Sequence, residues 1–338
     1  MVKYSCERCG KGFSQKSHYD SHNRRKTPCE NNADKIKALV DKTVEEKLKE
    51  LKELKELNKK IIVKNEEVIV NTLIMNKISN KSPLRYPGGK TRACKKLETI
   101  MKEHFDINDF DNLISPFFGG GSFEFHIQKN YQLNIIANDK FTPLYNFWNI
   151  CKNNKKNLCT ELTKKIDLID KEEFIYLRRK IMKENNKLNQ SIMYFIINRC
   201  SFSGSTLSGG FSLEASKKRF TKSSIERIKK LDLRKFDIYN LDFEDFINKN
   251  QDKKNLIFLD PPYYLKKASN LYGNNGDMHD TFDHNKLYKC LSTKQKWFMT
   301  YNNCEYIKNL YKDFKIIETS WSYGMNKSKK SSEIVIIG

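Results

Sequence analysis

Late in the chain, one short stretch places an acid, two prolines and two tyrosines directly after an apolar run. The stretch is NLIFLDPPYYL, and its polar end contains Asp260, Pro261, Pro262 and Tyr263. The Asp260 carboxylate and a Pro261 carbonyl held by the rigid Pro-Pro pair provide two acceptors, and the Tyr263 ring provides a flat stacking surface. These groups predict a clamp for a planar molecule with an exocyclic NH2, because binding both N–H bonds leaves the nitrogen lone pair directed at an electrophile. The chemistry indicated is methylation of an amino group without a covalent enzyme intermediate.

The apolar run itself indicates the element that must position this clamp. Leu256, Ile257, Phe258 and Leu259 follow one another without a polar residue, which is typical of a strand buried on both faces. Proline cannot continue a central strand, so the strand must end at Asp260. An open parallel sheet binds ligands in the crevice at the carboxyl ends of its strands, and we expect the clamp to lie there.

Two glycine-containing stretches fit a nucleotide-like ligand at the same edge. SPLRYPGGKTRA (82–93) has two glycines beside Tyr86 and Lys90, so the backbone can approach a ligand closely there. LISPFFGGGSFEF (113–125) has the pattern of a short strand, a glycine loop and the start of a helix. This order suits a nucleotide-like cofactor, although the glycine spacing differs from the usual dinucleotide pattern.

Two further strand ends carry acids. NIIANDKF (134–141) is predicted to be a strand that ends at Asp139, and NLDFEDF (240–246) closes another strand with Asp242 and Phe243. Asp139 is placed to accept hydrogen bonds from ribose hydroxyls. A glycine loop alone is often only a turn, but these stretches occur in one order within one α/β pattern.

Composition indicates the class of partner. The 338-residue chain has a formal net charge of +22, from 63 Lys and Arg against 41 Asp and Glu. This excess predicts a polyanionic partner, first of all nucleic acid, although a merely soluble basic protein is the alternative. No apolar run reaches the length of a membrane span and the N-terminus has no apolar signal region, so no membrane partner is expected.

The chain divides into three predicted parts: residues 1–32, 33–81 and 82–338. The first is a compact Cys/His cluster, the second is charged and has a helical pattern, and the third alternates strand and helix patterns. The nine cysteines include one tight pair, which suggests a metal site in a reducing, intracellular compartment rather than a disulfide framework.

The N-terminal cluster has the spacing of a zinc site. The candidate ligands are Cys6, Cys9, His22 and Cys29. They would give a tetrahedron of three thiolates and one imidazole, and the segment resembles a C2H2-type ββα finger whose last ligand is cysteine, with Phe13 and Tyr19 at the two core positions. His18 is a rival ligand, but its position matches the helix residues that face bases, alongside Gln15 and Ser21. A structural or protein-contacting finger is the alternative to DNA reading.

The middle segment has an irregular apolar stripe. Its apolar residues are Val40, Val44, Leu48, Leu51, Leu54, Leu57 and Ile61. The spacings mix fours with three successive threes, so the stripe drifts around a helix instead of holding a heptad seam. A solvated spacer helix is predicted, with self-association through a short coiled coil as the alternative.

The motifs of the third part resemble one enzyme family. LRYPGGK, PFFGGGSFEF, ANDKFTPLYNFW, NLDF and LDPPYY are similar, in content and order, to the motifs of Dam-type (D12 class) DNA adenine-N6 methyltransferases. The likeness covers about residues 82–338. It implies a Rossmann-like, S-adenosylmethionine-dependent methyltransferase with a mainly helical target-recognition insertion at 148–235, acting on double-stranded DNA.

The resemblance also assigns roles to positions. It implies that S-adenosylmethionine contacts Tyr86, Lys90, Pro116, Phe117, Gly119, Gly121, Asp139, Asp242, Phe243 and Asp260. It further implies that Asp260 and the Pro261 carbonyl grip the target amine beside Pro262, while Tyr263 stacks on an adenine flipped out of the duplex.

Within the insertion, FIINRCSFSGSTLSGGFS (195–212) resembles a family stretch that includes a DNA-contacting hairpin. The candidates for DNA contact are Arg199, Ser203, Ser205, Lys217 and Arg219. Enzymes specific for GATC have Asn-Gly where this chain has Ser203-Gly204, and a basic residue near Thr206 is missing, so GATC specificity is not predicted.

Two alternatives to adenine-N6 methylation stay open at this point. A cytosine-N4 methyltransferase would use the same clamp, although Asp before Pro-Pro and the order of motifs favour adenine. A zinc-finger DNA-binding protein with an inactive enzyme domain is the other, and the intact Lys90, Asp139 and Asp260 argue against it. The Lys-, Asn- and Ile-rich composition suits an AT-rich genome such as that of a large DNA virus.

Overall fold

The computed structural model describes residues 1–29, 32–77, 81–131, 133–265, 281–321 and 331–338. The chain forms two compact units, Met1–Asn76 and Lys77–Gly338.

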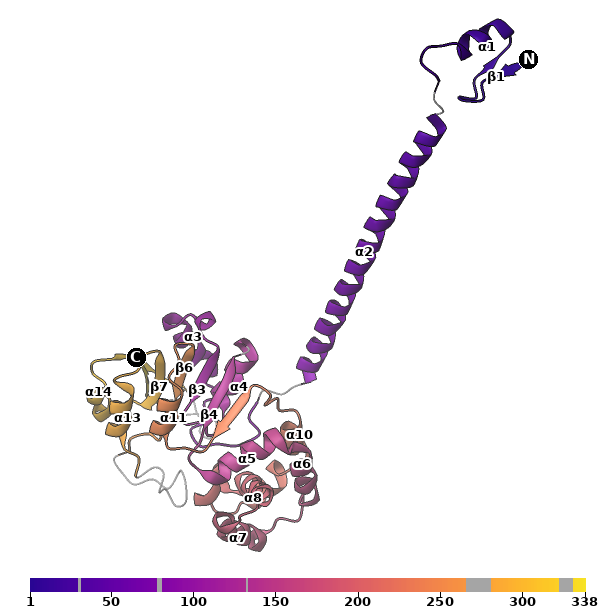
Figure 1. The fold of residues 1–338 in the computed structure, drawn as a ribbon. Helices are drawn as coiled ribbons and strands as arrows, with labels where there is room; N and C mark the ends of the chain where they lie inside the picture. The colour runs from indigo at the N-terminus through magenta and orange to yellow at the C-terminus, as the bar shows by residue number, and fades with distance from the viewer. Residues whose placement is uncertain (30–31, 78–80, 132, 266–280, 322–330) are drawn as a thin grey trace. The chain divides into compact units, whose positions relative to one another are not determined.

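The first unit begins with a small ββα module (Figure 1). Strands β1 (Tyr4–Ser5) and β2 (Gly12–Phe13) pair antiparallel, and helix α1 (Lys16–Asn23) follows them. The Phe13 ring lies 6.1 Å from Tyr19 and 5.0 Å from His22, measured between ring centroids. So few apolar side chains cannot stabilise a domain by burial alone, and small modules of this size usually depend on a metal or a disulfide.

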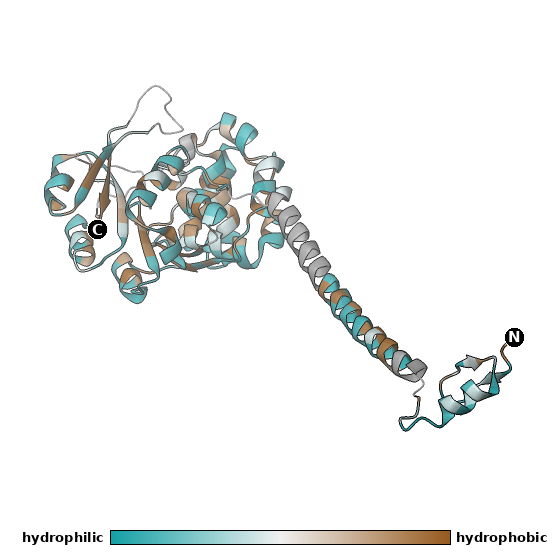
Figure 2. Ribbon diagram, turned by 90° about the horizontal axis from the view of Figure 1, so that it is seen from above, coloured by the Kyte–Doolittle hydropathy of each residue, from teal (hydrophilic) through white to brown (hydrophobic). Residues whose placement is uncertain are grey.

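Helix α2 (Asn32–Lys77) is a single helix of 46 residues. Its exposed large apolar side chains are Leu39, Val40, Val44, Leu48, Leu51, Leu54 and Leu57. Figure 2 shows apolar and polar residues interspersed along this part of the helix. Steps of three residues turn a helix by about 300°, so the four leucines from Leu48 to Leu57 rotate around it and form no single seam. Among the described residues, no helix is both long and apolar enough to cross a membrane.

The second unit is built on a mostly parallel sheet. Within the described residues the strand order is β5 (Phe236–Tyr239), β4 (Asn134–Asn138), β3 (Asn112–Ser115), β6 (Asn255–Leu259), β7 (Trp297–Asn302), β9 (Glu333–Ile337) and β8 (Lys315–Thr319). The first five strands are parallel, and β9 runs antiparallel to both of its neighbours. The predicted strand before Asp260 is therefore present, it is central, and every residue in it is buried.

Helices cover both faces of this sheet (Figure 1). Successive residues of a strand point to opposite faces: on β6, Phe258 belongs to one core cluster and Leu259 to the other. The first core is completed by α3 (Cys94–His104) and α4 (Ser122–Tyr131). The second core is completed by the helices α11 (Phe243–Lys249), α13 (His284–Leu291) and α14 (Glu305–Leu310). The result is a three-layer α/β unit of the Rossmann-like kind.

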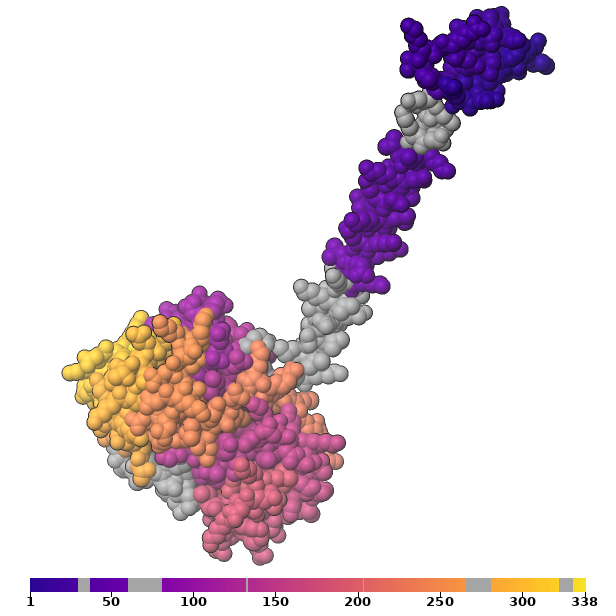
Figure 3. Space-filling view, in the orientation of Figure 1, coloured from indigo at the N-terminus to yellow at the C-terminus, as the bar shows by residue number. Residues whose placement is uncertain are grey.

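A helical insertion separates the parallel neighbours β4 and β5. Its helices are α5 (Thr142–Asn153), α6 (Lys155–Lys164), α7 (Lys171–Lys180), α8 (Lys187–Cys200), α9 (Leu213–Arg219) and α10 (Lys222–Lys229). Helix α8 lies at the centre, since all its residues from Met193 to Cys200 are buried. In the space-filling view these helices form a continuous lobe of the second unit (Figure 3). The segment predicted as a hairpin forms two short 3-10 turns, Phe202–Gly204 and Thr206–Ser208, closed by a bridge between Ser201 and Phe211.

Candidate active site

The carboxyl ends of the central strands open onto a cavity of about 530 Å³. Strands β3 and β6 are parallel neighbours, but the chain continues from β3 to β4 on one side and from β6 to β7 on the other. Such a reversal in strand order leaves a crevice at the sheet edge, where α/β folds bind ligands. The volume is that of a typical site for a small molecule or cofactor.

All of the predicted cofactor residues line this cavity: Tyr86, Lys90, Pro116, Phe117, Gly119, Gly121, Asp139, Asp242, Phe243 and Asp260. Pro262 lines it too, whereas Pro261 and Tyr263 lie just outside. The fold therefore brings residues from four strand ends and from the loop before α3 to one place. Their contacts with a cofactor stay a prediction.

The glycine loop after β3 needs its glycines. Gly119 and Gly121 have φ values of +49° and +66°, which side chains rarely adopt. A Cβ at Gly119 would also lie 2.8 Å from the ring of Tyr86, and one at Gly120 would meet the same side chain at 2.8 Å. The loop and Tyr86 are thus packed against each other, and together they form one wall of the cavity.

Asp139 ties this loop to the end of β4. Its Oδ2 accepts a hydrogen bond from the N–H of Gly119 and its Oδ1 accepts one from the N–H of Phe141, each at 2.9 Å. Burial raises the pKa of Asp139 to about 6, although both hydrogen bonds lower it. Each carboxylate oxygen keeps a lone pair, so Asp139 can still accept hydroxyl groups of a ligand.

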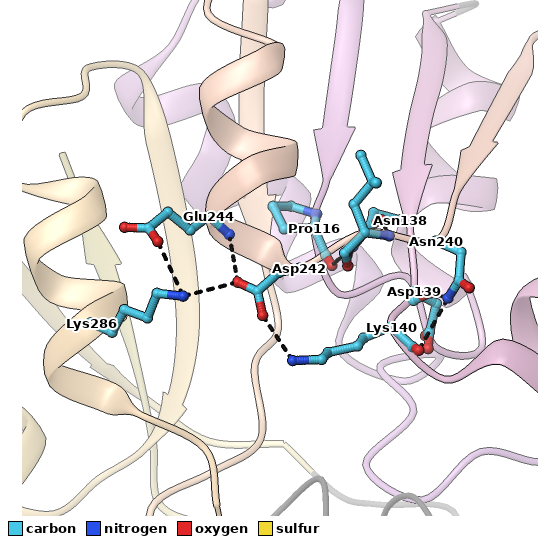
Figure 4. Close-up of polar contacts among 9 residues, drawn as sticks. Pro116, Asn138, Asp139, Lys140, Asn240, Asp242, Glu244 and Lys286 are labelled. Carbon is cyan, nitrogen blue, oxygen red and sulfur yellow. Dashed lines mark hydrogen bonds and ion pairs between the residues drawn. The ribbon is translucent and has the colours of Figure 1, made fainter.

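Asp242 is the N-cap of α11 and lies between two lysines (Figure 4). Its carboxylate accepts hydrogen bonds from Lys140 Nζ at 2.8 Å, from Lys286 Nζ at 3.2 Å and from the N–H of Glu244 at 3.2 Å. Burial raises the pKa of Asp242, but these three donors outweigh it and leave the pKa below its ordinary value. Asp242 is therefore a fixed anion at the rim of the cavity.

Three aromatic rings form the neighbouring wall. Phe117 lies 5.7 Å from Phe243, and Phe282 lies 5.6 Å from each of them, measured between ring centroids. The ammonium of Lys286 stands 5.2 Å from the centroid of Phe243. An apolar slot beside a hydrogen-bonding carboxylate suits a flat heteroaromatic ring.

Asp260 is held by a buried lysine. Nζ of Lys90 lies 2.6 Å from both carboxylate oxygens of Asp260 and donates a further bond to the Gly88 carbonyl at 3.0 Å. The Thr300 hydroxyl donates to Oδ1 of Asp260 at 2.8 Å. Lys90 is only 4% exposed, whereas the Asp260 side chain is 23% exposed, so the ammonium is shielded from solvent while the carboxylate still faces the cavity.

The ring of Tyr263, which is predicted to stack on a base, packs against a second aromatic ring. Tyr263 is stacked on Tyr301 with centroids 5.7 Å apart and planes 29° apart, and Lys90 Nζ stands 5.1 Å from the Tyr263 centroid. Tyr301 in turn shares a hydrogen bond of 2.6 Å with His284. Tyr263 is half-buried, so part of its surface faces outward beside Asp260.

Comparison with known families decides the identity. Residues 86–325 match the family model for the D12 class N6 adenine-specific DNA methyltransferase. The chain belongs to this family. Its reaction is therefore methyl transfer to N6 of adenine in DNA, and neither cytosine-N4 methylation nor an inactive enzyme domain is favoured. No curated protein matches the chain.

Several residues of this methyltransferase site were not predicted from the sequence. Glu124 lines the cavity, is 2% exposed and accepts a hydrogen bond from the Ser115 hydroxyl at 2.5 Å. Burial raises the pKa of Glu124 to about 7. Thr300, Phe282 and Lys286 also belong to the site. A lone acid within the apolar run after the glycine loop was the available signal for Glu124, whereas the other three follow no motif.

The predicted DNA contacts are placed unevenly on the methyltransferase. Lys217 is exposed, and Ser205 and Arg219 are half-buried. Ser203 lies in the 3-10 turn Phe202–Gly204. The ring of Phe202 in the same turn is 69% exposed, which is unusual for a large aromatic side chain.

Arg199, which the sequence predicts to contact DNA, is held inside the second unit. Its side chain is buried and donates to the carbonyl of Pro83 at 3.2 Å and to that of Arg219 at 2.8 Å. Burial lowers the pKa of Arg199 to about 10. This geometry places Arg199 at the joint between the insertion and residue 83 and not on the open surface.

The first unit brings the four predicted metal ligands together. The ligand atoms of Cys6, Cys9, His22 and Cys29 all lie within 4.8 Å of one another. The sulfurs of the first and last cysteines are 3.4 Å apart, and the Cys9 sulfur lies 3.4 Å from His22 Nε2. Two thiolates bound to one tetrahedral zinc ion stand about 3.8 Å apart, so the cluster fits the ion. His18 is exposed and lies outside this cluster.

Proposed function

We propose that this enzyme transfers the methyl group of S-adenosylmethionine to N6 of an adenine flipped out of duplex DNA, with Asp260 as the central catalytic residue. The observation that carries the proposal is the position of Asp260. Its carboxylate lies at the end of β6, on the wall of the cavity, and it is fixed from two sides by Lys90 and Thr300. A residue held in this way can orient a substrate amine with little loss of entropy.

The cavity has the features that S-adenosylmethionine requires. When bound, the cofactor supplies a methyl group on a positively charged sulfur. Asp139 would accept the ribose hydroxyls, and the slot between Phe117, Phe243 and Phe282 would hold the adenine ring. The loop from Gly119 to Gly121 lets the backbone approach the ligand, because a Cβ there would clash with neighbouring rings.

The lone pairs of Asp260 determine how it would hold the target. A carboxylate has about four lone-pair positions, and the two contacts from Lys90 and the one from Thr300 use three of them. The fourth lies on Oδ2, so we place one N–H of the target amine there and the other on the Pro261 carbonyl. With both N–H bonds held, the nitrogen lone pair would face the methyl group of a cofactor bound in the cavity. The surplus proton leaves through the hydrogen bond to Oδ2 after transfer.

The surface beside the site is suited to DNA. Exposed basic side chains of the insertion would bind phosphates, as expected from the net charge: Arg179, Lys217, Lys218 and Lys222. The exposed ring of Phe202 would contact bases, and the half-buried ring of Tyr263 would stack on the flipped adenine.

We further propose that the Cys/His cluster binds one structural zinc ion. Three thiolates and one imidazole are a common donor set for such sites, and the ββα module has little other means of stabilisation. The N-terminal module carries more basic than acidic residues, so we expect it to assist in capturing DNA.

The test is chemical. The purified chain is incubated with duplex DNA and S-adenosylmethionine, and the digested nucleosides are identified by mass spectrometry. We expect N6-methyladenine from the wild type and none from Asp260→Ala, while Asp237→Ala, at an exposed acid on β5, leaves the yield unchanged. Product from Asp260→Ala at the wild-type rate would contradict the assigned role.

A further inference from the structure

One buried carboxamide joins the recognition segment of the insertion to the loop that lines the cavity. Asn198, in the last turn of α8, is completely buried. Its Oδ1 accepts the N–H of Arg85 at 3.1 Å, and its Nδ2 donates to the carbonyl of the same residue at 2.6 Å. Both main-chain groups of one residue are thus held by one side chain. Only a carboxamide supplies a donor and an acceptor in this arrangement.

The other contacts of Asn198 reach the recognition segment, residues 202–208. Nδ2 lies 3.2 Å from the Thr206 hydroxyl and 3.4 Å from the Gly204 carbonyl. Gly204 packs directly on Arg85, since a Cβ at Gly204 would stand 2.8 Å from the Cβ of Arg85. Thr206 has a φ of +49°, an unfavourable conformation for a β-branched residue. The recognition segment is therefore held in a strained shape by groups that also hold Arg85.

The residues that follow Arg85 in the chain belong to the candidate active site. The next residue, Tyr86, packs against the cofactor loop at Gly119 and Gly120. Its carbonyl accepts the N–H of Gly89 at 3.0 Å, and Lys90 follows with its bond to Asp260. A movement of the recognition segment on DNA would thus be passed through the Arg85 backbone to the loop that holds both the cofactor wall and the catalytic pair.

Arg85 has one more feature that points to a ligand at this joint. Its guanidinium Nη1 is buried and has no hydrogen-bond partner among the described residues. A buried guanidinium nitrogen without an acceptor is costly, so a further acceptor beyond the described residues is expected to complete it. Asn198 fixes the backbone from which this side chain extends.

We propose that Asn198 is a positioning residue that couples DNA binding at the recognition segment to cofactor binding in the cavity. The inference rests on the proposed function. It requires that cofactor and DNA each bind more tightly when the other is present, by the same factor. Asn198 is completely buried and does not line the cavity, so its removal reduces this factor more than it reduces either affinity alone.

The test measures that factor in the full chain. The dissociation constant of S-adenosylhomocysteine, which permits no transfer, is measured by calorimetry with and without a duplex that the enzyme methylates. For the wild type we expect tighter binding on DNA by about 5- to 150-fold, the usual range of coupling. The coupling ratio is the dissociation constant without DNA divided by that with DNA. Asn198→Asp loses both N–H donors of the carboxamide, so its coupling ratio should fall to within about twofold of one. Binding of S-adenosylhomocysteine without DNA should be largely retained.

Two further variants keep the test decisive. Asn146→Asp is the matched control, because Asn146 is a buried carboxamide of α5 whose described hydrogen bond is donated to Gln190 within the insertion. Its ratio should equal that of the wild type. Thr206→Val keeps the shape but removes one acceptor of Asn198, so it should lower the ratio even if Asn198→Asp fails to fold.

Three results would overturn the inference. They are a wild-type ratio of one, an unchanged ratio in Asn198→Asp or Thr206→Val, and an equal loss in Asn146→Asp. A chain that binds neither S-adenosylhomocysteine nor DNA would instead contradict the proposed function.

Discussion

The Cys/His cluster and the Lys/Asp pair of this molecule are assembled in different ways. The Lys90 and Asp260 side chains, which we propose form the catalytic pair, are 170 positions apart in the chain, whereas the first and last thiols of the Cys/His cluster are 23 apart. The catalytic pair depends on the order of strands in a seven-stranded sheet and on two cores. The Cys/His cluster depends on one hairpin, one short helix and, on our proposal, a zinc ion. The catalytic pair is therefore stabilised by the fold, whereas we propose that the Cys/His cluster is stabilised by its ligand.

The sharpest way to test the catalytic side of this comparison is to remove Asp260. Asp260→Ala deletes the acceptor for the target amine and leaves the ammonium of Lys90 buried without its partner. We expect single-turnover methyl transfer to fall by at least about 10²–10⁴-fold, while cofactor binding persists at reduced affinity. Lys90→Met should cause a similar loss by freeing Asp260. A normal rate in either variant would show that the pair is not part of the chemistry.

The raised pKa of Glu124 should make the stability of the second unit depend on pH. Burial raises its pKa from 4.5 to about 7, so its contribution to the free energy of unfolding is present below pH 4.5 and is lost as pH rises through 7. Relative to Glu124→Gln, the wild type should lose about 3 kcal/mol of stability over this interval. Urea unfolding at a series of pH values measures the difference. Glu172→Gln, at an exposed acid, should change nothing; parallel curves for wild type and Glu124→Gln would contradict the burial argument.

Asp139 tests the cofactor wall. Asp139→Ala removes an acceptor for two ribose hydroxyls and releases the N–H groups of Gly119 and Phe141. Cofactor binding measured by calorimetry should weaken by about 1.5–3 kcal/mol. Asp237→Ala, on the neighbouring strand but away from the cavity, serves as the control. Equal affinities for wild type and Asp139→Ala would show that the end of β4 does not bind the ribose.

Tyr263 should have a smaller effect, because it supports the base without holding the amine. Tyr263→Ala removes one face of the stack and should cost about 1–3 kcal/mol in binding of the flipped base, with partial activity retained. Tyr263→Phe keeps the ring and should restore the rate. Fluorescence of 2-aminopurine at the target position reports the flipped state; full inactivity of the phenylalanine variant would assign the hydroxyl a direct role.

The metal cluster should give the smallest effect on turnover. Chelation of zinc, or a chain beginning near Lys81, should leave turnover at saturating DNA unchanged because every residue proposed to act in catalysis lies in the second unit. DNA affinity should fall, and the slope of log affinity against log salt should flatten by about 0.9 for each phosphate that the module no longer neutralises. Lower turnover with unchanged affinity and salt slope would instead make the N-terminal module part of the catalytic assembly.

The spacer helix can be tested in the same preparations. Since the leucines from Leu48 to Leu57 rotate around α2, we expect a monomer in sedimentation velocity at all concentrations used. A dimer that disappears in the chain beginning near Lys81 would favour the coiled-coil alternative.

Sequence reasoning succeeded where short motifs carry the information. Asp139 and Asp260 follow the mostly apolar strands β4 and β6, and Asp242 follows the edge strand β5, so all three lie at the carboxyl ends of parallel strands beside the cavity. Thr300 could not be found in this way, because its position beside Asp260 depends on the register that pairs Leu259 with Met299.

The position of Phe282 and the burial of Arg199 also depend on tertiary packing. Phe282 enters the aromatic slot from a segment with no motif, and only tertiary packing brings it to Phe117. Arg199 was predicted from its neighbours in the sequence, but charge alone does not show whether a side chain is exposed. Burial is set by the packing of α8, which no local pattern reports.

The place of the insertion in the sheet bears on how such enzymes change their target in evolution. Helices α5 to α10 connect β4 to β5, and these two strands are paired neighbours, with Ile135 of β4 opposite Phe236 of β5. Because these strands are parallel, the insertion leaves β4 at its carboxyl end and enters β5 at its amino end, so the sheet fixes the positions of both junctions. A different helical lobe could be exchanged there by recombination without disturbing the sheet. A transplanted lobe would work only if it kept the side chains that grip Pro83 and Arg85, so new specificities are expected to arise on the outer residues of the lobe while its inner joint is inherited intact.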